Sequence, residues 1–592
     1  MRQVPRLSFS FFPKTSVGVV VAVLALVQQR ALLGQAPNPP TPPASEQKPV
    51  DGIPVSDPLV ISKCGTCHKQ DTNGNLTRIS WERTTPEGWQ EAIKRMVRLN
   101  GLSLTPDEAR AIVKSLSASH GLAPEEAKAV AYMSEHRSDD ETYPNDNIRT
   151  TCAACHPFGR AASFRRSPEE WKLLADLHVA LYPVVELTAF RRRPGPPPPG
   201  QAAPPPDAPR APQPVDQAIE FLTKTYPLIT PEWASWRTRE RAPKLAGKWL
   251  VMAHVVGKGL YSGEVTVDSG ASADEFNTRI RMTPVAGGRT IERTGKAAVF
   301  SGYAWRGRST GQPSGSGPDD IPAEWRESMT IAPDQSAAEG RWFWGAYDEF
   351  GMDVKLWRAT GATTLLTLDR ASLKIGTQAQ RVRILGDSLP AQIAGADIDF
   401  GAGVTVRRVV SHTAQEVVVE VDIASNAILG RRDVAVGRAV LPNAIGVYDK
   451  VDYIKVVPRT SIARLGGGSA HPKGYEQFEV MAYNRGPDNK DNTVDDFEIG
   501  RVDVDWSLEE FHEMFSDDDK EFVGSLSQTG LFTPALDGPN PQRKQMRNNY
   551  GTVWVVATAK SDKDKDGKPL TAKSYLVVSP PLYIIWDREI TP

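Results

Sequence analysis

The chain has only four cysteines among 592 residues, too few for a disulfide framework to hold a protein of this size together. All four stand just ahead of a histidine: Cys64 and Cys67 before His68, and Cys152 and Cys155 before His156. The sequence therefore contains two CxxCH motifs and has no cysteine left over.

Long apolar runs are also scarce. The run Val17–Val27 has eleven residues, fewer than the roughly 20 that a helix needs to cross a bilayer. It follows Arg2, Arg6 and Lys14 and is followed by the small-x-small sequence Gly34-Gln-Ala36. Residues 1–36 are therefore predicted to be a cleaved secretory signal that delivers the protein to the periplasm. An uncleaved membrane anchor is the alternative.

No excess of charge of either sign is present. The chain has 70 basic and 71 acidic residues and a formal net charge of −1, which gives no reason to expect a nucleic-acid partner. Its length exceeds what one hydrophobic core supports, so several domains are expected.

Composition divides the chain into a helical part and a β part. A Pro-rich tether is predicted over residues 37–56, and helical periodicity over 57–243 is interrupted by a Pro-rich insertion at 191–214. Short β-branched runs between Gly, Asp and Pro follow. They predict three all-β domains: an antiparallel β-barrel at 244–373, an immunoglobulin-like β-sandwich at 374–458 and a C-terminal β-sandwich at 459–592. None shows a recognisable catalytic constellation, so no catalytic residue is assigned and these domains are interpreted as docking scaffold.

An internal repeat organises the helical part. Thr85-Pro-Glu-Gly-Trp89 follows the first CxxCH motif, and Ser167-Pro-Glu-Glu-Trp171 follows the second. The repeat continues where residues 116–127 correspond to residues 222–234, which are one residue longer. The helical part is therefore predicted to be two cytochrome-like halves.

The CxxCH motif is typical of covalently bound haem c. Two cysteines one helical turn apart form thioethers with the haem, and the adjacent histidine binds the iron. A zinc site would need more Cys or His ligands, and a redox dithiol needs no adjacent histidine. Two haem c groups are predicted, held by Cys64 and Cys67 and by Cys152 and Cys155, with His68 and His156 as iron ligands.

The repeat also suggests the sixth iron ligands. Met96 lies seven residues after Trp89, and His178 lies seven residues after Trp171. If this helix position faces iron, one haem has His68 and Met96, and the other has His156 and His178. Ordinary core packing is the alternative for Met96, and His120 and His136 compete with His178.

These ligand sets predict a direction for electron transfer. A thioether ligand raises the reduction potential above that of a bis-histidine haem, so electrons are expected to pass from the second haem to the first. Two six-coordinate irons would leave no open position for a small substrate.

Two Asp-rich segments begin like calcium loops, Asp562–Gly567 and Asp488–Asp496. The first has Lys573 where a calcium loop needs a bidentate glutamate. An Asp-Gly hairpin between neighbouring strands explains it as well.

The signal, the repeated CxxCH unit with its Met96 and His178, Cys152-Ala-Ala-Cys-His-Pro-Phe-Gly-Arg160 and the order of the β units together resemble the α subunit of quinohemoprotein amine dehydrogenase. The resemblance covers nearly the whole mature chain; the Pro-rich insertion departs from it. It implies that a cysteine tryptophylquinone in a small partner subunit oxidises the amine, beside a β-propeller subunit in a heterotrimer. This chain would carry electrons from the quinone to an external cytochrome c or blue copper protein.

Two other functions compete with that interpretation. A free-standing dihaem carrier could serve a different dehydrogenase, and a dihaem peroxidase would be an enzyme in its own right. The peroxidase would need one iron without a strong sixth ligand, visible as a high-spin ferric haem.

Overall fold

A computed structural model describes residues 51–581 apart from 138–140, 192–211, 469 and 513–516. The predicted signal peptide, most of the tether and most of the Pro-rich insertion lie outside the described residues. Within the part described, no helix is both long and apolar enough to span a membrane.

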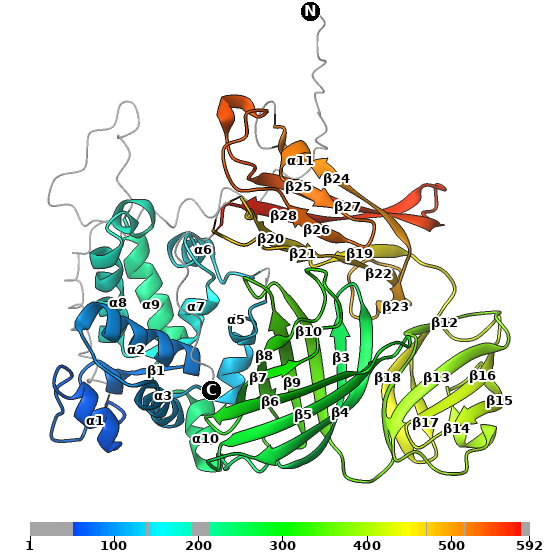
Figure 1. Cartoon of the computed structure of the whole chain (residues 1–592), viewed down its shortest axis with the longest axis horizontal. Helices are drawn as coiled ribbons and strands as arrows, with labels where there is room; N and C mark the ends of the chain where they lie inside the picture. Colours follow the sequence, from blue (N-terminus) through cyan, green and yellow to red (C-terminus); the bar gives the residue numbers. More distant parts are fainter. Residues whose placement is uncertain (1–50, 138–140, 192–211, 469, 513–516, 582–592) are drawn as a thin grey trace, which may run out of the picture. The chain divides into compact units, whose positions relative to one another are not determined.

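The chain begins with a helical region and continues as β structure (Figure 1). The helical region contains α1 (Pro58–Cys64), η1 (Ile79–Trp81), β1 (Glu82–Thr84), α2 (Pro86–Asn100), α3 (Pro106–His120), α4 (Pro124–Lys128), α5 (Ala131–Ser134), α6 (Asp146–Thr151), α7 (Gly159–Ala162), β2 (Phe164–Arg166), α8 (Pro168–Leu181), η2 (Glu186–Phe190), α9 (Pro214–Thr225) and α10 (Pro231–Arg239).

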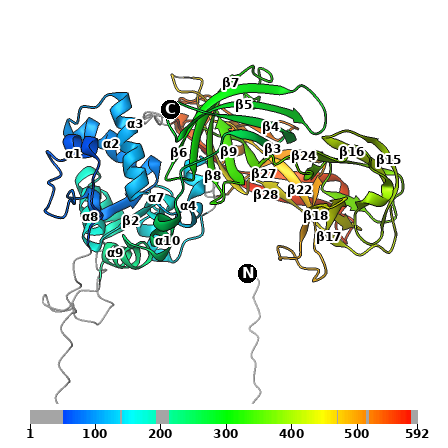
Figure 2. The ribbon, with the colours of Figure 1, turned by 90° about the horizontal axis from the view of Figure 1, so that it is seen from below.

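The two halves of the helical region are built alike. Helices α2 and α8 both start with a proline, and the hydroxyls of Thr85 and Ser167 accept hydrogen bonds from backbone N–H groups in the first turn. These are N-caps, which satisfy donors that the helix leaves free. Trp89 and Trp171, one turn later, are 3% and 1% exposed. Helix α2 packs on α3 and α8 packs on α9, side by side in both views (Figures 1 and 2).

A closed eight-stranded antiparallel barrel follows, in the order β10-β3-β4-β5-β6-β7-β8-β9. Its strands are β3 (Gly247–Val255), β4 (Gly259–Ser269), β5 (Glu275–Pro284), β6 (Ile291–Phe300), β7 (Ala304–Gly311), β8 (Glu324–Ile331), β9 (Ala337–Trp344) and β10 (Phe350–Arg358). Alternate residues of β5 are buried, as expected for a strand with one face toward the barrel interior.

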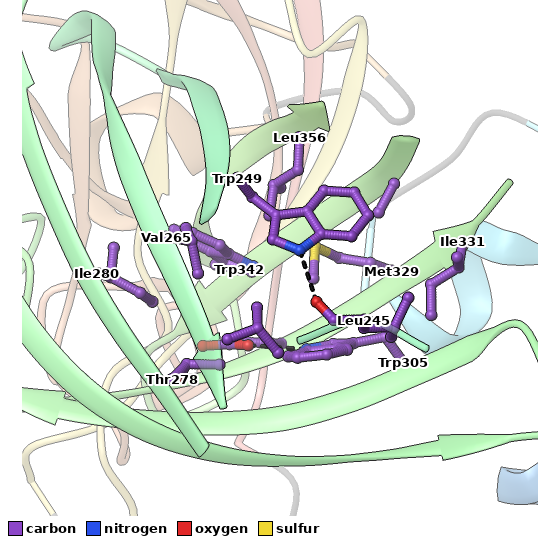
Figure 3. A pocket seen from close by; sticks show the side chains of 13 residues that line it. Leu245, Trp249, Val265, Thr278, Ile280, Trp305, Met329, Ile331, Trp342 and Leu356 are labelled. Carbon is purple, nitrogen blue, oxygen red and sulfur yellow. Dashed lines mark hydrogen bonds between the residues drawn. The ribbon is translucent and has the colours of Figure 1, made fainter. Parts of the chain in front are cut away.

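Tryptophans fill much of the barrel interior. Figure 3 shows Trp249, Trp305 and Trp342 around a cavity. The cavity has a volume of about 20 Å³, and the Trp249 indole N–H donates to the Leu245 carbonyl at 2.9 Å. This volume holds about one water molecule. The barrel is therefore a packed core.

Two four-stranded sheets form the next unit, with orders β11-β13-β16-β15 and β12-β18-β17-β14. The elements are β11 (Thr364–Leu368), β12 (Ser372–Lys374), β13 (Gln380–Asp387), η3 (Gly395–Asp397), β14 (Ile398–Asp399), β15 (Val404–His412), β16 (Glu416–Ile423), β17 (Gly430–Val436) and β18 (Ala439–Tyr448). Inward side chains of both sheets share one apolar core. Strand β11 precedes residue 374, the predicted start of this unit, yet pairs with β13.

The last unit contains three sheets with orders β19-β22-β23, β20-β28-β27-β24 and β21-β26-β25 around one core. Its elements are β19 (Tyr453–Val457), β20 (Thr460–Arg464), β21 (Glu476–Gln477), β22 (Glu479–Asn484), β23 (Phe497–Arg501), β24 (Val504–Glu510), α11 (Asp519–Phe522), β25 (Gly524–Leu526), β26 (Leu531–Pro534), η4 (Lys544–Met546), β27 (Gly551–Lys563) and β28 (Pro569–Ser579). The Asp-rich segment 562–567 lies in the β27–β28 hairpin, where the Asp564 carboxylate accepts hydrogen bonds from the backbone of Asp566 and Lys568.

Candidate haem sites

The first CxxCH motif begins where α1 ends. The N–H groups of Cys67 and His68 both donate to the carbonyl of Cys64, at 3.2 and 2.9 Å, so the motif forms a tight turn. His68 Nδ1 lies 2.8 Å from the carbonyl of Thr77. A metal-bound histidine commonly donates its other ring N–H to a backbone carbonyl in this way, which leaves Nε2 of His68 as the ligand atom.

The second motif follows α6, where Cys152 is the C-cap residue. Cys152 donates its N–H to the carbonyl of Ile148 at 2.9 Å, and His156 Nδ1 lies 2.9 Å from the carbonyl of Pro157. Glu141 accepts the N–H groups of Phe158 and Gly159 at 2.7 Å each. Sequence reasoning missed this carboxylate, since only the fold brings it to the motif.

The structure brings His156 and His178 together. Their ring centroids lie 6.4 Å apart, with planes inclined by 43°. Imidazoles on opposite sides of one metal, each nitrogen about 2 Å from it, would have centroids roughly 6 Å apart. His178 Nδ1 is held by the carbonyl of Leu174 at 2.8 Å, so both Nε2 atoms remain available for one iron.

Met96 occupies on α2 the position that His178 occupies on α8. Its side chain is half-buried, and the Asn100 amide donates to its sulfur at 3.6 Å. The apolar cluster that contains Cys64 includes Trp89 and Ile93 of α2 but not Met96. The structure therefore places Met96 on the expected helix without setting it against Cys64.

The competing histidines are engaged elsewhere. His120 is fully buried; its Nε2 lies 3.0 Å from the Ile53 carbonyl and its Nδ1 lies 2.8 Å from the Ser119 hydroxyl. Burial lowers the pKa of His120 to about 4. His136 Nδ1 lies 3.4 Å from a carboxylate oxygen of Asp348. These contacts favour His178 over both as an iron ligand.

The thiols do not have the character of a redox dithiol. Burial raises the pKa of Cys64, and burial raises the pKa of Cys152 to about 11, whereas reactive CxxC cysteines have lowered pKa values. Burial also lowers the pKa of His156, which keeps this imidazole neutral and able to bind metal.

A zinc site is also disfavoured. Across the described residues, the only group of three or more potential ligands within 4.8 Å of one another is Asp488, Asp495 and Asp496. Neither CxxCH motif therefore has the third and fourth ligands that structural zinc requires.

Two buried donors in the second half fit a haem carboxylate. Trp171 Nε1 and Arg166 Nε have no hydrogen-bond acceptor in the part of the chain that the structure describes. Buried donors are normally satisfied, and haem carries two propionate carboxylates. The equivalent of Trp171 in the first half is Trp89, and it differs because its Nε1 donates to the His120 carbonyl at 3.1 Å. The residues of the second half thus fit a haem, since they offer two buried donors to a carboxylate.

A helical region with two CxxCH motifs, followed by an eight-stranded barrel and further β units, defines a modular haem-binding protein. Four protein-family models match it: the haem-binding region of quinohemoprotein amine dehydrogenase A, alpha subunit, at residues 55–194, and alpha subunit domains II, III and IV of the same enzyme at residues 242–359, 362–449 and 454–589. The chain belongs to the family of quinohemoprotein amine dehydrogenase alpha subunits. That enzyme is a multi-subunit oxidoreductase.

Other comparisons add little. No curated protein matches the chain. Among solved structures, a de novo designed fluorescence-activating β-barrel is 18% identical and covers 20% of this chain and 98% of its own, with a TM-score of 0.16. Human protocadherin-24 EC1-2 is 13% identical and covers 37% and 97%, with a TM-score of 0.14. Likenesses at these scores carry no argument about fold or function.

Proposed function

We propose that this chain is the dihaem electron-transfer subunit of a periplasmic amine dehydrogenase. Cys64 and Cys67 would hold one haem c and Cys152 and Cys155 the other. The observation that carries the proposal is the pair His156 and His178, whose ring centroids lie 6.4 Å apart and whose Nδ1 atoms each lie against a backbone carbonyl. A haem bound by both histidines has no free coordination position, which suits electron transfer and not peroxide chemistry.

The haems supply one-electron redox chemistry, and the protein's residues hold and tune them. His68 with Met96 would complete the first site, and the thioether ligand would give it the higher potential. Electrons would then pass from the site of His156 and His178 to the site of His68 and Met96. No residue of this chain is assigned to amine oxidation.

The family supports the choice of partners. A cysteine tryptophylquinone in a small subunit would oxidise the amine beside a β-propeller subunit, and an external cytochrome c or blue copper protein would remove the electrons. The predicted signal at residues 1–36 would deliver this chain to the periplasm.

We also propose that the β units serve as docking scaffold. The two sheets between Thr364 and Tyr448 enclose one core, which supports an immunoglobulin-like sandwich. The last unit would be a second sandwich. Asp488, Asp495 and Asp496, three of the four aspartates in segment 488–496, are not proposed as a calcium site.

The deciding experiment is to purify the native protein from the periplasm and to follow the haem absorption bands after a primary amine is added. Reduction of the haems, with two smaller subunits co-purifying, would support the proposal. A lone cytochrome that does not respond to amines would indicate a free-standing carrier. A high-spin ferric haem in the resting protein would indicate a peroxidase.

A further inference from the structure

One buried carboxylate lies where the two halves of the helical region meet. Strands β1 and β2 pair antiparallel, which places Arg83 opposite Arg165. These residues are equivalent in the repeat, and like charges opposite each other on a ribbon repel. Glu126 of α4 lies between them.

Glu126 is bonded to both halves. Arg83 donates to its two oxygens from Nη1 and Nη2 at 2.8 and 3.0 Å, and Arg165 donates from Nε at 3.0 Å. Thr230 Oγ1 and the Ala123 N–H also donate to it, both at 2.8 Å. The side chains of Arg83, Arg165 and Glu126 are 0%, 7% and 4% exposed. They form a central triad whose formal charges sum to +1.

The repeat is not symmetric at the triad. Glu126 is the third residue of α4, and its counterpart Trp233 is the third residue of α10. The Arg83 guanidinium lies 4.7 Å from the Trp233 ring centroid. The two equivalent arginines therefore share one acid, and Arg83 in addition lies over the Trp233 ring.

Short contact chains lead from the triad toward each CxxCH motif. Arg165 lies over the Tyr226 ring at 4.8 Å, and Tyr226 lies 6.2 Å from Phe158, two residues after His156. In the other half, Arg83 donates to the carbonyl of Gly121 at 3.0 Å. Gly121 follows His120, whose carbonyl is bonded to Trp89 in the Cys64 cluster.

We infer that Glu126 is a positioning residue that holds the two haem units in register and sets the charge between them. The inference rests on the proposed function, because it requires a haem at each motif. Reduction adds an electron to iron, so nearby positive charge favours the reduced state, and charges act strongly where water is excluded. Glu126 therefore holds both reduction potentials below the values that two uncompensated arginines would produce.

The test is a redox titration of the haem-loaded full-length chain with the two haems resolved. Glu126→Gln keeps the side-chain shape and raises the triad charge, so both midpoint potentials should shift upward. Arg165→Gln lowers the triad charge, so both should shift downward. The double variant restores the original charge and should return both potentials toward those of the unaltered chain.

The matched control is Glu125→Gln, one residue earlier on α4. Glu125 is about half exposed and pairs with Arg239 at 2.8 Å, so its loss should leave both potentials unchanged.

Unaltered potentials in Glu126→Gln and Arg165→Gln, with only lower thermal stability, would show a purely structural role and overturn the inference. If Glu126→Gln does not fold, Arg165→Gln alone decides by the direction of its shift. A chain with no covalently bound haem would overturn the proposed function, and this inference with it. Unchanged potentials in a chain that carries two haems would overturn this inference alone.

Discussion

The indole nitrogen of Trp89 donates a hydrogen bond to the backbone oxygen of His120 over 3.1 Å. Among the described residues Trp171 Nε1 has no acceptor, and the carbonyl of Tyr226, the counterpart of His120, accepts the backbone N–H of Arg166 at 3.3 Å. The two halves of the repeat thus have the same helices but different buried hydrogen bonds.

This difference separates the roles of the two tryptophans. Trp89→Phe leaves the buried His120 carbonyl without its indole donor, so the free energy of unfolding should fall by about 1–3 kcal/mol, with little change in either potential. Trp171→Phe should lower the potential of the second haem, because a carboxylate that loses its donor stabilises ferric iron. Denaturant unfolding and a redox titration measure both effects. An unchanged second-haem potential in Trp171→Phe would argue against a carboxylate at Nε1.

Replacing His178 should open the second haem. His178→Ala removes the imidazole that lies beside His156, so one of the two ferric haems should change from low spin to high spin. Electron paramagnetic resonance measures this directly. His120→Asn is the control: it removes a buried histidine whose nitrogens are both engaged, and it should reduce stability with both haems still low spin. Two low-spin haems in His178→Ala would exclude His178 as a ligand.

Replacing Met96 should change the reduction potential of the first haem. Met96→His replaces a thioether with an imidazole and should lower the potential of the first haem. The order of the two potentials would then no longer favour transfer toward the first haem. A titration that finds neither haem shifted would place the ligand elsewhere.

Glu126 should make the protein sensitive to acid. Burial acts to raise the pKa of this carboxyl, but the hydrogen bonds and charges of Arg83 and Arg165 outweigh it and lower the pKa to about 2, against 4.5 as the ordinary value. A lowered pKa contributes stability above pH 4.5 that is lost as the pH falls toward 2. The shift corresponds to about 3 kcal/mol.

Glu126→Gln should therefore weaken the dependence of stability on pH between 4.5 and 2. Denaturant unfolding of both proteins at pH 6 and at pH 3 measures this. Parallel losses of stability in the two proteins would contradict it.

Glu327 should be important for the barrel. It is 3% exposed and accepts hydrogen bonds from Ser309 Oγ and from the indoles of Trp305 and Trp325 at 2.9 and 3.1 Å. Glu327→Ala leaves these buried donors without acceptors and should cost at least about 3 kcal/mol. Glu324→Ala, on the same strand, removes a half-exposed ion pair with Arg308 and should cost less than about 1 kcal/mol. Equal losses in thermal unfolding would show that the buried contacts do not matter.

The haem motifs and their helices could be predicted because their signals are local. The CxxCH spacing needs one helical turn, and the Pro-Glu-x-Trp repeat sets α2 and α8 in the same phase. From this repeat, Met96 and His178 were predicted to occupy equivalent positions on the two helices. The structure places His178 beside His156.

The contacts across the repeat could not be read in the same way. Glu126 lies 43 residues from Arg83 and 39 from Arg165, and its neighbour Glu125 has the same charge but lies at the surface. Glu126 differs from Glu125 in lying against Arg83 and Arg165, which the pairing of β1 with β2 brings together. The pairing of strands in the β units could not be predicted either. Alternation of apolar and polar residues predicts which side chains face inward but not that β11 pairs with β13.

The exchange of Glu126 for Trp233 at one point of the repeat shows what a fused chain can do that a symmetric homodimer cannot. Two identical subunits meeting at this ribbon would bring either two acids or none to the paired arginines. When the two copies are joined in one polypeptide, each copy can change its sequence independently. A single negative charge can then be kept between the paired arginines. The two CxxCH motifs can then differ in the residues around them while the helical framework stays duplicated.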